Sequence, residues 1–151
     1  MFDGLKDFFG AFTPADGSAS GSHAPGVRLA VAVLLVEVMR ATDGISAQER
    51  MAAARFLAER FKLRADEMPS LLQRAEHESI AAYDYFRFTD PLDEALSQES
   101  KIALVEAMWK VAYADRHADP QENMVISKVA DLLHVPHGDY IAAKMRAKPR
   151  G

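Results

Sequence analysis

The sequence predicts an all-α protein, a compact bundle of about six or seven helices with an internal duplication. Apolar residues recur every three or four positions along most of the chain, which is the period of an amphipathic helix. Two of these segments begin with a Ser or Asp followed three residues later by Glu, a pattern typical of a helix N-terminus. No run of four or more residues alternates between apolar and polar with turn residues at both ends, so we expect no strands.

The composition limits the classes of protein to which the chain can belong. A chain of 151 residues, 49% hydrophobic and 26% charged, fits one domain with a sizeable core. The absence of cysteine excludes disulfides, thiolate metal sites and Cys nucleophiles, and fits a reducing compartment. The formal charge is -4 without a basic stripe, so we do not expect nucleic acid as a partner.

Neither a membrane span nor a signal peptide is expected. The longest uncharged apolar run, Leu29–Val36, is shorter than the roughly 20 residues that cross a bilayer. The first residues carry acidic side chains and lack the cationic start of a signal peptide. We therefore expect a cytoplasmic protein.

Composition divides the chain into four segments. They are an amphipathic helix over residues 1–12, a flexible linker rich in Gly, Ser and Pro over 13–26, a helical domain over 27–147 and a tail over 148–151. The linker composition is typical of a flexible coil.

One face of the N-terminal helix is strongly apolar. It carries Phe2, Leu5, Phe8, Phe9 and Phe12. Such a face is too apolar to stay solvated on a tethered helix. We expect this face to bind a partner: its own domain, a second copy, the groove of another protein, or a membrane surface. The low positive charge of the segment leaves at most a peripheral membrane contact.

Each helix of the domain has its own sequence signal. Residues 27–41 are apolar on nearly every side, which predicts a central, buried helix. Ser46 and Glu49 form a capping box that opens a helix to about Phe61. Further starts are marked at Asp66 with Pro69, Pro91, Ser97 or Ser100, Asp119 with Pro120, and Pro136 with Asp139. Pro91 suits the first turn of a short helix, because a proline lacks the N–H that a helix interior uses.

The duplication concerns a helix, an acidic loop and a capped helix. The aligned pairs are Asp43 with Asp115, Ser46 with Asp119, and Glu49 with Glu122, with one extra residue in the second loop. Two such units usually pack about a pseudo-two-fold axis. That packing either brings the two loops together or places them at equivalent ends of the bundle, and the spacing does not distinguish the two.

The acidic residues have two interpretations. Capping explains the Ser46–Glu49 and Asp119–Glu122 pairs. Asp43 and Asp115 follow the C-terminal end of a long helix, where a carboxylate is unfavourable. Asp43 fits an Asp-Gly turn, and Asp115 has Lys110 or Arg116 as possible ion-pair partners.

A bound cation is the other way to compensate these charges. It would use oxygen ligands, and the candidate metal ligands are Asp43, Glu49, Asp115, Asp119 and Glu122. Oxygen ligands favour Ca²⁺, Mg²⁺ or Mn²⁺ over Zn²⁺. The full EF-hand pattern is absent, so this is not an EF-hand.

Several segments resemble the TerB family of tellurite-resistance proteins, which is related to the N-terminal domain of DjlA-type membrane co-chaperones. The segments are Leu35–Glu49, Leu104–Ile126 and the terminal "VADLLHVPHGDYIAAKMRA", with "WKVAYAD", "DPQE" and "YFRFT" the most telling parts. The resemblance covers roughly Val27–Ala147, and "MFDGLKDFFG" is similar to the leader of stand-alone members.

The resemblance implies an all-helical duplicated fold, no enzymatic activity, and a role in stress response and tellurite resistance. It also implies metal binding through the acidic loops, here Asp43, Glu49, Asp115 and Glu122, with Asp119 as a further candidate. The second loop departs from the family, which usually has Gly where this chain has Arg116. That departure removes a flexible residue and adds a cation, which argues against a metal at the second loop.

Two functions follow as hypotheses. The chain is a non-catalytic stress-response module that binds a divalent cation, or a co-chaperone-like protein-interaction module whose acidic loops are only helix caps. In the second case its N-terminal helix or a helical groove binds a protein partner. No motif of a nucleotide-binding, metalloprotease or hydrolase active site occurs, so we expect no enzyme.

Overall fold

The computed structural model describes residues 26–42, 44–81, 85–115 and 118–149. Within these ranges it contains seven α-helices and no strand. The helices are α2 (Val27–Arg40), α3 (Ala47–Phe61), α4 (Glu67–Ala81), α5 (Phe86–Ala95), α6 (Gln98–Ala112), α7 (Pro120–Leu132) and α8 (His137–Ala147). The all-α bundle is therefore confirmed, and the internal duplication stays a prediction. The helix expected over residues 1–12 lies outside the described residues.

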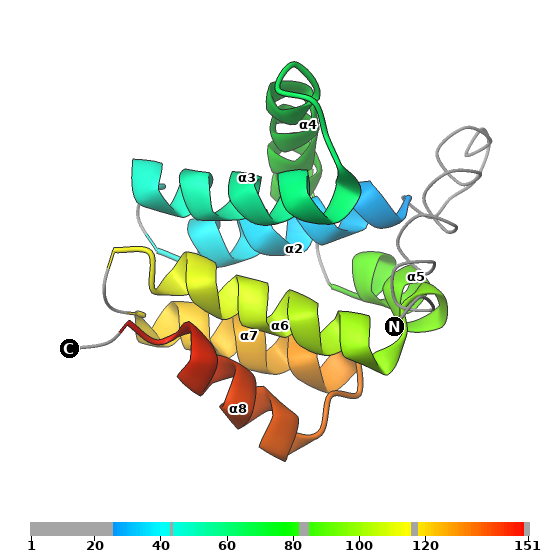
Figure 1. The fold of residues 1–151 in the computed structure, drawn as a ribbon, viewed down its shortest axis with the longest axis vertical. Coiled ribbons are helices and arrows are strands. Elements are labelled where there is room, and N and C mark those ends of the chain that lie inside the picture. Colours follow the sequence, from blue (N-terminus) through cyan, green and yellow to red (C-terminus); the bar gives the residue numbers. More distant parts are fainter. Residues whose placement is uncertain (1–25, 43, 82–84, 116–117, 150–151) are drawn as a thin grey trace.

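Helix α2 is the centre of the bundle, as its sequence predicts. Every residue of α2 except Arg28, Glu37 and Arg40 is buried. It packs against α3, α4, α5, α6 and α7 (Figure 1). A helix that is apolar on all sides is stable only when other elements surround it, so this one segment organises the fold.

The predicted helix caps form. The Ser46 hydroxyl accepts from the Glu49 N–H at 3.0 Å, and Glu49 Oε1 accepts from the Ser46 N–H at 3.0 Å. At the start of α6, Ser97 Oγ accepts from the N–H of Ser100 at 3.1 Å. Each cap satisfies amide groups that a helix start leaves without an intrahelical partner.

The prediction for Pro91 is wrong. Pro91 lies inside α5 rather than in its first turn. A proline in a helix interior removes a hydrogen bond and usually costs about 3 kcal/mol or more. The start of α5 is set instead by Phe88, Thr89 and Leu92, which are at most 1% exposed. Their burial against α2 and α7 offsets the cost of the proline.

The two acidic loops lie at one end of the bundle. Helix α2 ends and α3 begins at the end where α6 ends and α7 begins (Figure 1). At the opposite end lie the start of α2, the end of α3 and the start of α6. The acidic loops and the start of α2 therefore lie at opposite ends of the bundle.

Candidate functional site

A polar pocket of about 670 Å³ lies between the α2–α3 loop and the α6–α7 loop. Its lining residues are Ala41, Thr42, Gly44, Ile45, Ser46, Glu49, Asp115, Asp119 and Gln121. The two loops therefore meet, which the sequence spacing leaves open. Gly44 has a φ of 76°, a left-handed conformation that glycine adopts without strain.

Two glutamates, each in the first turn of the helix that follows one of the loops, lie against each other beside this pocket. Glu49 and Glu122 are each 2% exposed. Asp119 is the N-cap of α7, and its N–H donates to Glu122 Oε1 at 2.8 Å, so α7 opens with a capping box like that of α3. The carboxyl group of Glu49 lies close enough to that of Glu122 to raise its pKa. Two neighbouring buried carboxyl groups favour a state in which one of them carries a proton.

The electrostatics of the pair follow from its burial. Loss of contact with water is the largest of the effects that together raise the pKa of Glu122 to about 8. The Glu49 side chain and the negative charge of Asp119 also raise this pKa, whereas the hydrogen bond from the Asp119 N–H lowers it. A buried carboxylate beside a second one is unfavourable unless a proton or a cation balances the charge. At neutral pH this pair therefore holds a proton.

The remaining predicted ligands are distributed unevenly. Asp115 is exposed just beyond α6 and Asp119 is half-buried, and both line the pocket with Glu49. Among the residues with described positions, no three or more His, Asp or Glu side chains form a group that could hold a metal ion. Asp43 lies outside the described residues, as do the predicted partner-binding residues Phe2, Leu5, Phe8, Phe9 and Phe12.

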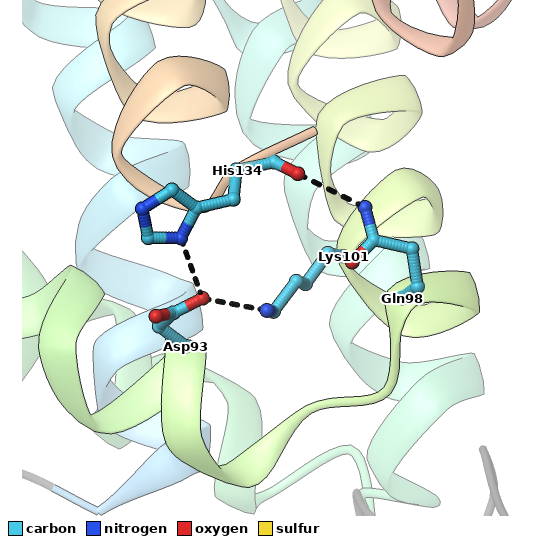
Figure 2. Close-up of polar contacts among 4 residues, drawn as sticks. All are labelled: Asp93, Gln98, Lys101 and His134. Atoms are coloured by element: carbon cyan, nitrogen blue, oxygen red, sulfur yellow. Dashed lines mark hydrogen bonds and ion pairs between the residues drawn. The ribbon is translucent and has the colours of Figure 1, made fainter. Parts of the chain in front are cut away.

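The sequence analysis did not find a second polar cluster, which Figure 2 shows. Asp93 Oδ1 on α5 accepts from Lys101 Nζ on α6 at 2.6 Å and lies 3.2 Å from His134 Nδ1. Gln98 Nε2 donates to the backbone oxygen of His134 at 3.1 Å. The hydrogen bond from Lys101 lowers the pKa of Asp93, and the contact with His134 lowers it further, against the opposing effect of burial.

This second cluster is a structural link. It ties α5 and α6 to the turn between α7 and α8, where His134 adopts a left-handed φ of 63°. Since Asp93 and His134 are distant in the sequence, no spacing pattern could have predicted their contact.

A third cluster joins α2 to α4. Ser79 is 2% exposed and donates to Glu37 Oε2, and Arg40 Nη1 donates to Ser79 Oγ at 2.8 Å. Burial raises the pKa of the nearby Tyr85 hydroxyl, and the charge of Glu37 adds to this effect. The polar groups of this cluster satisfy one another, so it too is a link between helices.

The fold and the pocket define a small helical-bundle protein whose main polar site is built from two acidic loops between helices. The chain belongs to the TerB family, because the family model described as tellurite resistance protein TerB matches residues 28–145. Comparisons with curated proteins and with solved structures found no match. None of the seven described helices is both long and apolar enough to cross a membrane.

Proposed function

We propose that this chain is a non-catalytic, cytoplasmic stress-response module of the tellurite-resistance type that binds a divalent cation between its two acidic loops. The observation that carries the proposal is the contact between Glu49 and Glu122. Two carboxyl groups at 2% exposure need a compensating positive charge or a shared proton. A cation in the adjoining pocket would supply the positive charge that a proton otherwise supplies.

The oxygen atoms around the pocket fit a hard cation. Glu49 and Glu122 each use Oε1 to cap a helix, and a cation would take the place of the proton between the two carboxyl groups. Asp115 and Asp119 add carboxylates at the pocket lining, and Asp43 belongs to the first loop by sequence. Such a set favours Ca²⁺, Mg²⁺ or Mn²⁺ over Zn²⁺, which takes His and Cys readily.

Binding also requires a rearrangement of the loops. The described side chains form no group of three ligands, so the proposal requires Asp115 to move toward the glutamates. The loops are suited to such a change, because Asp115 is exposed and is not held by a helix.

The second candidate function is a protein-interaction module whose acidic loops only cap helices. The observation in its favour is that Glu49 and Glu122 both take part in capping boxes, a role that is complete without metal. In that case the N-terminal segment or a helical groove binds a protein partner.

Thermal melts distinguish the two functions. The chain is treated with EDTA and melted alone and with Ca²⁺, Mg²⁺, Mn²⁺ or Zn²⁺. A cation at about 100 times its Kd adds about 2.7 kcal/mol, which at this size raises Tm by roughly 5–10 °C. We expect this shift with one of the hard cations and its loss in the double variant Asp43→Asn, Asp115→Asn.

The matched control is Asp90→Asn, Asp131→Asn, which removes the same charge at exposed positions on α5 and α7. It should keep the full shift. If no cation shifts the Tm of the wild-type chain, the cation function is wrong and the capping interpretation stands.

A further inference from the structure

A trough runs along the seam between α3 and α6. It is made of two hollows of about 420 and 410 Å³. Both hollows are lined by Phe56, Glu59, Ala107 and Lys110, so they are continuous. The trough extends from Gln48 and Ala114 near the acidic loops to Arg60 and Ala103 near the opposite end of the bundle.

The floor of the trough is apolar and made largely of small side chains. Ala52, Ala103 and Ala107 leave space that larger residues would fill, and Phe56 lies half-buried beside them. At one end Met51 is 62% exposed. The apolar part of the trough is widest at this end, where Met51, Ala52, Phe56 and Ala107 line one hollow together.

We propose that residues 2–12 of the same chain dock in this trough as a helix, through the apolar face defined above. The lengths agree. From Ala103 to Ala114 the trough follows α6 and the turn after it for about 16 Å, and a helix over residues 2–12 is about 15 Å long, at 1.5 Å per residue. Burial of phenylalanine rings on an alanine floor provides the driving force.

The charges of the segment and of the trough are also complementary. The docking segment carries Asp3, Lys6 and Asp7, a net negative charge. The trough has Arg55, Arg60 and Lys110 against Glu59 and Glu106. Glu106 is already paired with Arg146 at 2.7 Å and Lys110 at 3.5 Å. The rim is therefore net positive and complements the segment.

The connection favours docking within one chain over docking between two. Residues 13–25 lead to α2, which begins at the end of the bundle where α3 ends and α6 begins (Figure 1). A Gly- and Ser-rich chain of this length has a root-mean-square span of roughly 20 Å and a maximum of roughly 43 Å. It reaches either end of the trough. A short tether also gives an effective concentration in the millimolar range, above that of a second copy in solution.

Paramagnetic NMR on the full chain tests this proposal. Since the chain has no cysteine, Gly4→Cys provides a single site for a nitroxide label. We expect loss of amide signal intensity at Ala52, Phe56, Ala103 and Ala107. Signals of α7, such as that of Met124, should keep their intensity.

Variants on both sides of the contact test the site. Phe8→Asp, Phe9→Asp should abolish the effect. Met51→Glu should weaken it, because it removes apolar surface and repels the aspartates of the segment. Met124→Glu is the matched control, with a methionine of similar exposure, 72%, and it should change nothing. The variant Phe8→Asp, Phe9→Asp alters no residue of the acidic pocket, so its outcome is independent of cation binding.

Three results would overturn the proposal. They are the absence of signal loss in the trough, signal loss centred on another face, and signal loss in a mixture of nitroxide-labelled chain with ¹⁵N-labelled chain that carries no nitroxide. The last result would show that a second copy occupies the trough.

Discussion

The buried carboxyl groups of Glu49 and Glu122 lie beside each other although each belongs to a different helix cap. Each glutamate accepts a backbone N–H of its own N-cap residue and meets the other glutamate at the junction of α3 and α7. One contact therefore links the starts of two helices beside the acidic pocket.

The first prediction concerns pH. The pKa of Glu122 is about 8 in the folded chain against an ordinary value of 4.5, so the folded state holds a proton that the unfolded state releases. The stabilisation is complete below about pH 4.5 and is lost as pH rises toward 8, with a slope of up to about 1.4 kcal/mol per pH unit. Urea unfolding between pH 5 and 8 should show this decline, and Glu122→Gln should remove most of it.

A control for this prediction is Glu94→Gln at an exposed position on α5. It should keep the wild-type slope. If the wild type and Glu122→Gln share the same pH dependence, the two carboxyl groups do not share a proton.

The second prediction concerns the cap of α3. Ser46→Ala removes the hydroxyl that accepts the Glu49 N–H at 3.0 Å. We expect the free energy of unfolding to fall by about 0.5–2 kcal/mol, measured by urea denaturation. Ser70→Ala, at an exposed position on α4, should change stability by less than about 0.5 kcal/mol. Equal effects of the two changes would mean that the cap is energetically unimportant.

The third prediction concerns the link of α5 to α6 and the α7–α8 turn. The lowered pKa of Asp93 means that its contribution is present above its ordinary value of 3.8 and is lost as pH falls through the lower folded value. Since the Asp93 side chain is 31% exposed, Asp93→Asn should cost only about 0.2–1 kcal/mol at pH 7. The cost should shrink in high salt and below pH 3.8. A cost that is the same at pH 3 and pH 7 would contradict the ion-pair interpretation.

The fourth prediction concerns the central helix. Leu34 is 0% exposed on α2, and Leu34→Ala should lower the free energy of unfolding by about 2–5 kcal/mol, because it leaves a cavity. Ile141→Ala on α8, where the side chain is 39% exposed, should cost much less. Denaturation followed by circular dichroism provides the measurement. A small effect at Leu34 would mean that α2 is not the centre of the core.

The features that the sequence determined alone are local ones. The capping box of Ser46 and Glu49 forms because the two residues are three apart, so a helix start brings them together wherever the helix is placed. The burial of α2 also follows from its composition, because apolar residues lie on nearly every side of this helix. The membership of the TerB family rests on the same linear patterns.

Tertiary packing decided the rest. It placed Glu49 against Glu122 and Asp93 against His134, contacts between residues far apart in the chain that no period or spacing encodes. It also moved the start of α5 ahead of Pro91, since the burial of Phe88 and Leu92 outweighs the local preference of proline. Local rules act over one helical turn, whereas the acidic pocket and the α3–α6 trough exist only where helices from distant segments pack side by side.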